Sequence, residues 1–264
     1  MDVKYYIGKG IEEKPLQNII QGGMCSVFKR IGCIGDSLSA GEIEAINAEG
    51  KPFGWDTYEY SWPAYMAKHT GCEVLNFSRG GMTAKEYVES FAESNGYWDR
   101  DKSCQAYIIA LGVNDILNCN WELGTVRDAF DTCDGKREKS VAGYYGEIIR
   151  RLKEISPGSA FFLVSMPRSG LWLDENDNKK RAHRDLLKGF CESFENTYLI
   201  DLFEYAPLYD EKFYERFFLG GHMSPVGYHF TALMIESYID FIIRGNPEKF
   251  SEICFIGTKY KRLK

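Results

Sequence analysis

The sequence predicts an α/β protein, a three-layer α/β/α sandwich of the flavodoxin-like type with five parallel strands in its sheet. Short apolar runs alternate along the chain with segments whose apolar residues recur at helical spacing. The clearest run, 105–111, is apolar on both faces, as strands of a parallel sheet are. At 264 residues, 44% of them hydrophobic, the chain can bury one substantial core. Right-handed crossovers between such strands place helices on both faces of the sheet.

The predicted elements follow from the breaks between these runs. Strands are expected at about 30–36, 73–77, 105–111, 160–166 and 198–202. Helices are expected from Pro63 to Gly71, from about Ala84, from Val141 to Pro157, up to about Phe194, and from Pro225 to about Arg244. Pro63 and Pro225 suit the first turn of a helix, where a missing N–H costs nothing, and Ser224 supplies an N-cap.

The segment 40–62 shows no sustained period and is interrupted by glycine and proline. We expect a long loop at the ligand edge of the sheet, because loops of this length in a compact domain are usually functional lids. Residues 1–28 are interpreted as an extension packed on the core, 29–245 as the α/β domain, and 246–264 as a C-terminal tail.

Composition excludes several classes of function. The net charge of −6 argues against a nucleic-acid surface, which needs clustered Lys and Arg. Eight cysteines occur without a C-x-x-C pair, so the sequence does not support a structural zinc site. We also expect no other metal and no cofactor. The N-terminus lacks the apolar core of a signal peptide, and no stretch is long enough to span a membrane. We therefore expect a cytoplasmic protein, with secretion after signal removal left open.

Polar residues follow several of the predicted strands. Ser37 comes directly after the first strand, where it is a candidate nucleophile or, with Asp36, a helix cap. Gly81 and Asn114 lie in the turns after the second and third strands, and His222 lies in a loop before the last helix. All four are expected at the same edge of the sheet. The other histidines fall within predicted helices, so His222 is the candidate general base.

This pattern resembles the SGNH (GDSL) hydrolase family. The resemblance rests on Gly35-Asp36-Ser37-Leu38-Ser39, Gly81-x-Thr83, Gly112-x-Asn114-Asp115 and the late His222, and it spans about residues 30–243. It implies a cofactor-free esterase in which Ser37 attacks an acyl carbonyl and His222 transfers the proton. It also implies an oxyanion hole made by the backbone N–H groups of Ser37 and Gly81 and by the side-chain amide of Asn114.

The sequence departs from the family at one position. The family usually carries an Asp three residues before the catalytic His, but this chain has Leu219 there. Three explanations stay open: a backbone carbonyl that orients His222, reduced activity, or an acid from elsewhere in the chain. The candidate acids are Asp201, Glu204, Asp210 and Glu215. We favour a Ser-His dyad and leave the identity of any acid unknown.

The expected reaction is hydrolysis of a short acyl ester, with an acetyl group on a carbohydrate as the favoured substrate. Aromatic rings suit sugar faces, and four tryptophans lie in or beside the predicted edge loops, namely Trp55, Trp62, Trp121 and Trp172. An acyltransferase, a lysophospholipase or thioesterase with the same Ser-His pair, and a non-catalytic carbohydrate-binding module are the alternatives. The oligomeric state cannot be read from the sequence.

Overall fold

The computed structural model describes residues 13–130 and 140–263. Its central sheet contains five parallel strands in the order β4-β1-β5-β6-β7. Their bounds are Arg30–Gly35 for β1, Glu73–Asn76 for β4, Ala106–Ala110 for β5, Ala160–Val164 for β6 and Thr197–Ile200 for β7. This strand order is that of a flavodoxin-like sheet, so the predicted fold class is confirmed.

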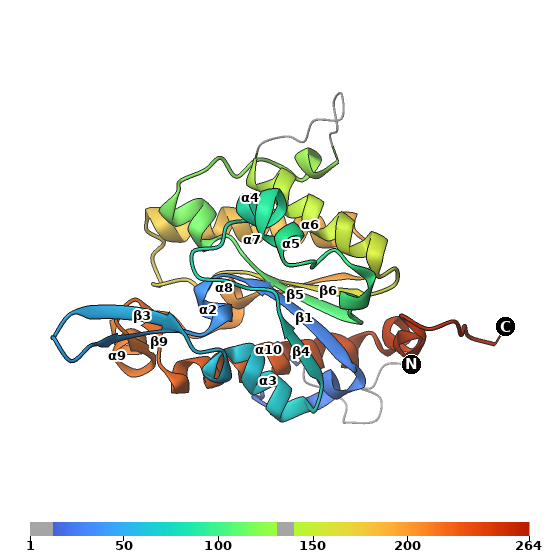
Figure 1. Cartoon of the computed structure of the whole chain (residues 1–264), viewed down its shortest axis with the longest axis horizontal. Coiled ribbons are helices and arrows are strands. Elements are labelled where there is room, and N and C mark those ends of the chain that lie inside the picture. Colours follow the sequence, from blue (N-terminus) through green and yellow to red (C-terminus); the bar gives the residue numbers. More distant parts are fainter. Residues whose placement is uncertain (1–12, 131–139, 264) are drawn as a thin grey trace.

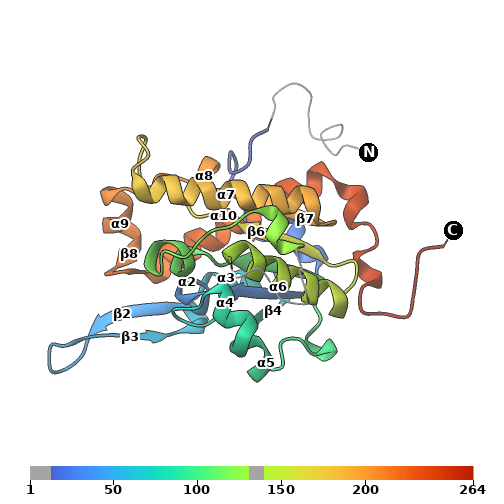
Figure 2. The same ribbon diagram turned by 90° about the horizontal axis from the view of Figure 1, so that it is seen from above.

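Helices cover both faces of the sheet (Figures 1 and 2). On one face lie α3 (Trp62–Thr70) and α10 (Pro225–Gly245), and on the other lie α6 (Val141–Ile155) and α7 (Glu175–Ser193). The shorter helices are α2 (Ser37–Ala40), α4 (Ala84–Glu86), α5 (Ala92–Ser94), α8 (Leu202–Tyr205) and α9 (Glu211–Phe217). Short 3-10 helices span Gly23–Val27, Tyr58–Tyr60, Arg100–Lys102, Val126–Ala129, Pro247–Phe250 and Ile253–Phe255. Short π-helical segments span Tyr87–Phe91 and Val113–Asn118.

A side-chain cap stands before each long helix. The hydroxyl of Ser61 accepts from the N–H of the residue three positions on, and Ser140 and Ser224 do the same. Asp174 caps α7 through its carboxylate. Such caps satisfy one of the N–H groups that a helix leaves free at its start, so these boundaries follow from local chemistry.

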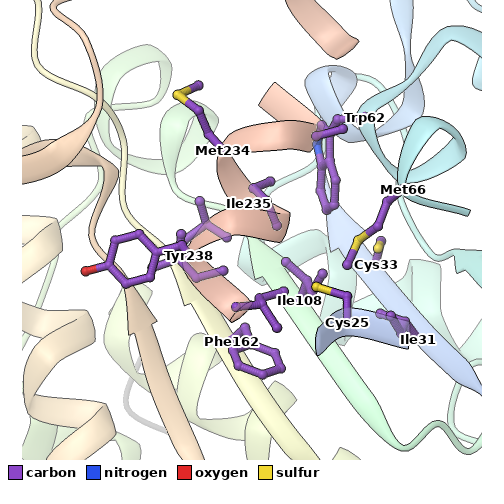
Figure 3. Packing of buried hydrophobic residues seen from close by; sticks show 14 of the residues in the cluster. Cys25, Ile31, Cys33, Trp62, Met66, Ile108, Phe162, Met234, Ile235 and Tyr238 are labelled. Carbon is purple, nitrogen blue, oxygen red and sulfur yellow. The ribbon is translucent and has the colours of Figure 1, made fainter. Parts of the chain in front are cut away.

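The two hydrophobic cores lie between the sheet and its helix layers. Figure 3 shows the core under α3 and α10, where Ile31, Ile108 and Phe162 from the strands meet Trp62 and Ile235 from the helices. The second core joins the opposite face of the sheet to α6 and α7. Because both faces are covered, the central strands β1, β5 and β6 are buried at nearly every position, as their apolar sequence predicts, whereas the edge strands β4 and β7 are partly exposed.

The predicted loop over 40–62 is wrong, because most of this segment forms a β-hairpin. Strand β2 (Glu42–Ile46) pairs antiparallel with β3 (Pro52–Asp56), and the hairpin projects from the body beside α9 and β9 (Figure 1). A second, smaller hairpin joins β8 (Phe218–Leu219) to β9 (His222–Met223). Most of the first hairpin is exposed, so it lacks the apolar run that identifies a buried strand.

The N-terminal segment, as far as the structure describes it, is tied to α10. The N–H of Ile20 donates to Ser237, that of Gly22 to Glu236, and that of Met24 to Asp240. The seven cysteines within the described residues are free thiols. Across the described ranges, no helix is both long enough and apolar enough to cross a membrane.

Topology places a crevice at one edge of the sheet. The chain passes from β1 to its neighbour β4 on one side and then crosses to β5 on the other side of β1. The connections that leave β1 and β5 therefore diverge, and ligands of such sheets bind outside the carboxyl ends of strands at this point. Ser37 follows β1 and Asn114 follows β5.

Candidate active site

A cavity of about 570 Å³ opens at this edge of the sheet. Ser37, Gly81, Asn114 and His222 all line it, although they come from four separate segments of the chain. The structure thus brings together every candidate catalytic and oxyanion residue that the sequence predicted.

Ser37 is the first residue of α2, immediately after β1. Asp36 is the N-cap, and its carboxylate accepts a hydrogen bond of 3.1 Å from the N–H of Leu38. The Ser37 N–H belongs to the first turn, whose N–H groups have no partner within the helix. The cap and the candidate nucleophile are therefore different residues, so the two interpretations of this motif are compatible.

The neighbouring serine does not line the large cavity. Ser39 is only 1% exposed, its hydroxyl accepts from the indole N–H of Trp62 at 3.2 Å, and it lines only a smaller cavity next to the large one. A Cβ at Gly35 would lie 2.1 Å from the Ser39 Oγ, so the turn requires glycine at this position. Of the two serines, only Ser37 lines the large cavity.

Asn114 lies in the π-helical turn after β5, and its amide is held at both ends. Its Nδ2 donates to the carbonyl of Met82 at 3.1 Å, and its Oδ1 accepts from Asn118 at 2.7 Å. An amide nitrogen has two hydrogens, so one stays available for a ligand oxygen in the cavity. Gly81 has a φ of +70°, a conformation that L side chains rarely adopt, which explains glycine there.

Asp115 connects the two turns that carry Gly81 and Asn114. Its Oδ1 accepts from the N–H of Ala84 at 2.9 Å, while its Oδ2 has no hydrogen-bond partner among the described residues. Burial raises the pKa of Asp115 to about 6, and burial likewise raises the pKa of Asp36 to about 6. Both aspartates accept hydrogen bonds from backbone N–H groups. Because both are buried, their charged forms cost free energy.

We expect Asp115→Asn to become more stable relative to wild type as the pH rises. In the unfolded chain Asp115 has its ordinary pKa, whereas in the folded state its pKa is raised. The folded state is therefore fully stabilised by protonation of Asp115 only when the pH lies below the ordinary pKa. This contribution is lost as the pH rises through the folded pKa of about 6. The difference in unfolding free energy should thus shift in favour of the variant by up to about 3 kcal/mol between pH 4 and pH 7.

Urea denaturation at several pH values measures this difference. Glu49→Gln, a change of the same charge at an exposed position, is the matched control and should show a difference independent of pH. A flat difference for Asp115→Asn over the same range would contradict the assignment.

His222 stands between two carboxylates of the β2–β3 hairpin. Its Nδ1 lies 2.7 Å from Oε1 of Glu44, and its Nε2 lies 3.7 Å from Oε2 of Glu42. The second oxygen of Glu44 accepts from the N–H of Gly221 at 2.9 Å. Glu44 was missed at the level of sequence, because its segment was interpreted as a loop.

None of the four acids considered from the sequence is hydrogen-bonded to His222. Asp201 caps α8 and pairs with Arg184 at 2.7 Å, and Asp210 caps α9. Among the described residues, neither Glu204, Glu215 nor a backbone carbonyl makes a hydrogen bond to the imidazole. The partner at Nδ1 is the Glu44 carboxylate.

The other histidines lie away from the cavity, as their places within helices predicted. His69 Nδ1 is 2.8 Å from Oε1 of the buried Glu236, and the Nε2 atoms of His69 and His229 are 3.1 Å apart. His183 is fully buried, which lowers its pKa to about 4. Within the described ranges, no group of three or more His, Cys, Asp or Glu side chains is arranged to hold a metal ion.

The tryptophans do not line the large cavity, contrary to expectation. Trp62 is buried, whereas the other three are exposed, with Trp55 stacked on Phe53 at 4.8 Å. The aromatic residues of the cavity are instead Tyr209, Tyr214 and Phe218. The sequence offered little signal for them, because they lie in and around α9, which has no strand-end motif.

A second, apolar cavity of about 90 Å³ adjoins the first. The two share Leu38, Val113 and Met166 among their lining residues, and the small cavity extends inward to Trp62 and Ile235. The large cavity also has polar lining residues, among them Lys180, which donates to Ser169 at 2.6 Å and pairs with Asp177 at 2.9 Å. The site thus combines a small apolar cavity with a larger cavity that is partly polar.

The sequence profile of the GDSL-like Lipase/Acylhydrolase family matches residues 33–230. A search of curated proteins found no match. Several solved structures share the fold at low sequence identity, so the likeness to them concerns the fold alone.

A family two carbohydrate esterase from Clostridium thermocellum, in complex with cellohexaose, superposes with a TM-score of 0.56 at 15% identity, covering 88% of this chain and 66% of that one. Est24, a carbohydrate acetylesterase from Sinorhizobium meliloti, has a TM-score of 0.52 at 14% identity, covering 81% and 99%. A putative lipolytic protein of the G-D-S-L family from Desulfitobacterium hafniense has a TM-score of 0.50 at 17% identity, covering 80% and 99%. This chain spans about two thirds of the length of the family two esterases it matches.

Proposed function

Because the chain belongs to the GDSL-like lipase/acylhydrolase family, we propose that it is a serine esterase that removes a short acyl group, acetyl in the first place, from a carbohydrate. The observation that carries this proposal is the convergence of Ser37, Gly81, Asn114 and His222 on one cavity. A nucleophile, a base and oxyanion donors in one cavity are what acyl transfer needs.

In the proposed reaction, Nε2 of His222 takes the proton of the Ser37 hydroxyl while Oγ attacks the acyl carbonyl carbon. The carbonyl oxygen becomes negative and is held by the N–H groups of Ser37 and Gly81 and by Asn114 Nδ2. The carbon–oxygen bond of the ester then breaks, and the alcohol leaves with the proton from His222. Water repeats these steps on the acyl-serine and releases the acid.

The resting geometry is looser than this reaction requires. Among the described residues, the Ser37 hydroxyl makes no hydrogen bond to the imidazole. Such hydrogen bonds often tighten only in the complex with substrate. The proposed base and nucleophile line the same cavity, and the mechanism requires their side chains to come within hydrogen-bond distance there.

The shape of the site supports a small acyl group and a polar alcohol. The apolar cavity of about 90 Å³ suits a short acyl chain, and a fatty acyl chain would need a longer apolar channel. Tyr214 and Phe218 stack at 4.2 Å and line the large cavity, as do Lys180 and Asn176. Aromatic faces with polar neighbours suit sugar rings. The carbohydrate esterases with the same fold support the same choice.

A fluorophosphonate probe tests the proposal. We expect stoichiometric labelling of the purified protein at Ser37, located by mass spectrometry, and no labelling of His222→Ala. Hydrolysis of acetylated xylan or cello-oligosaccharides should then exceed hydrolysis of long-chain acyl esters. A folded wild-type protein that takes up no label would overturn the serine-esterase mechanism and leave the carbohydrate-binding module as the alternative.

A further inference from the structure

The position at which the family carries its aspartate is occupied by a leucine in this chain. Leu219 lies in β8, directly opposite His222 in the antiparallel pair β8–β9, and is 45% exposed. An aliphatic side chain there cannot accept a hydrogen bond from the imidazole. If His222 is oriented by an acid, that acid must come from a different element.

We propose that Glu44, from the β2–β3 hairpin, is the positioning residue that orients His222 and completes a Ser-His-Glu triad. The inference rests on the proposed function and deepens it, because it names the third member of the catalytic group. Glu44 Oε1 lies 2.7 Å from Nδ1 of His222, a short and charge-assisted contact between atoms of the right kind.

Strand alternation explains why this glutamate reaches the histidine. Side chains two residues apart in a strand lie on the same face, so Glu42 and Glu44 share one face of β2 while Ile43 takes the other. The backbone of β2 is fixed at its base, where the Tyr228 hydroxyl donates to the Glu42 carbonyl at 2.6 Å. The acid is therefore held by a paired strand and not by a mobile loop.

The turn before His222 is built to receive the carboxylate. A Cβ at Gly220 would lie 2.1 Å from Glu44 Oε2, and one at Gly221 would lie 3.0 Å from Oε1. Gly220 also has a φ of +71°, which favours glycine. The N–H of Gly221 donates to Oε2, so the turn both makes room for Glu44 and fixes its second oxygen. Leu219, the glycine pair and Glu44 thus form one consistent arrangement.

The contact sets the tautomer of the imidazole. The hydrogen bonds from the Gly221 N–H and from His222 lower the pKa of Glu44, so its carboxylate is ionised at neutral pH. An ionised carboxylate only accepts hydrogen bonds, and Nδ1 must therefore carry the proton. Nε2 is then left free to accept the proton of Ser37.

Glu42 cannot take this part. Its Oε2 is 3.7 Å from Nε2, which is beyond hydrogen-bond range and on the nitrogen that must face the nucleophile. The charged groups that face His222 are Glu42 and Glu44 from β2 and Asp36 from the turn before α2. Of these, only Glu44 contacts Nδ1.

Glu44→Gln is the variant that tests the inference. A carboxylate accepts from both Gly221 and His222, whereas an amide has one accepting oxygen and one donating nitrogen. In the variant, the amide oxygen can accept from the Gly221 N–H or from His222, but not from both. If the amide nitrogen faces the imidazole instead, it donates to Nδ1 and favours the wrong tautomer. We expect kcat/KM to fall by about 10² to 10⁴, since removing the corresponding aspartate charge in the serine-protease template costs about 10⁴ in kcat.

The pH profile separates positioning from a structural effect. Loss of the carboxylate destabilises the imidazolium, so the rise of kcat/KM with pH should move to lower pH in Glu44→Gln. Glu49→Gln, the same change at the tip of the same hairpin, should keep wild-type activity and profile. An activity of Glu44→Gln within about threefold of wild type, with an unmoved profile, would overturn the inference.

A measurement that needs no turnover keeps this inference separate from the proposed function. In the Ser37→Ala background, the ring ¹⁵N chemical shifts of His222 should report a proton held on Nδ1, and adding Glu44→Gln should abolish this tautomer preference. If wild type takes no fluorophosphonate label but the tautomer depends on Glu44, the esterase proposal fails while the Glu44–His222 contact stands. If label is taken up but the tautomer is unchanged in Glu44→Gln, Glu44 is not the positioning residue.

Discussion

Replacing Ser37 with alanine is expected to lower kcat for ester hydrolysis on the order of 10⁶-fold, to the level left by binding and the oxyanion hole. The neighbouring Ser39 cannot take its place, because its side chain is buried and engaged with Trp62. The fold should be retained, since the Ser37 side chain lies at a cavity and fills no core position. Initial rates on an acetyl ester, with far-UV circular dichroism of both proteins, measure the two expectations.

Ser39→Ala is the matched comparison for Ser37→Ala. It removes the hydroxyl that accepts from the Trp62 indole, so a loss of stability of about 1 kcal/mol is expected, with hydrolysis within a few-fold of wild type. The reverse result, activity lost in Ser39→Ala and kept in Ser37→Ala, would refute the assignment of the nucleophile.

Replacing His222 with alanine is expected to cost nearly as much as replacing Ser37, again on the order of 10⁶ in kcat. Without the imidazole, the Ser37 hydroxyl keeps its proton at neutral pH and is a weak nucleophile. Because the two residues act as one unit, the double variant Ser37→Ala/His222→Ala should be no slower than either single variant. Steady-state kinetics of the three proteins decides this.

His229→Ala serves as the comparison for His222→Ala, because His229 contacts His69 and does not line the cavity. We expect unchanged hydrolysis in that variant. If the losses in His222→Ala and Ser37→Ala instead multiplied in the double variant, the two residues would be acting independently, and the proton-transfer pair would be wrong.

The sheet could be predicted from sequence because its central strands β1, β5 and β6 are buried on both faces. The run 105–111, for example, is apolar throughout and ends where Gly112 begins the Asn114 turn. The β2–β3 hairpin could not be found in the same way. Its strands are mostly exposed and carry Glu, Gly and Pro, so what holds them is pairing and contact with distant residues, which local pattern does not show.

The same physical difference separates the predicted and the missed parts of the site. Ser37, Gly81 and Asn114 directly follow strands, so topology alone brings them to one edge. Glu44 meets His222 across 178 positions of sequence, and only the docking of one hairpin on another creates that contact. The signal that existed was indirect: a Glu-x-Glu spacing in one segment and a missing acid, with two glycines, in the other.

The docking of β2 against the His222 turn has a consequence for chimeric versions of this chain. The four sequence blocks and the hairpin are separate stretches of sequence, so a chimera that exchanges residues 41–57 for a short connection would keep every block intact. It would nevertheless lose the carboxylate at Nδ1 of His222. The hairpin and the Gly220-Gly221 pair therefore have to be exchanged together, since a change in either one withdraws the fit of the other.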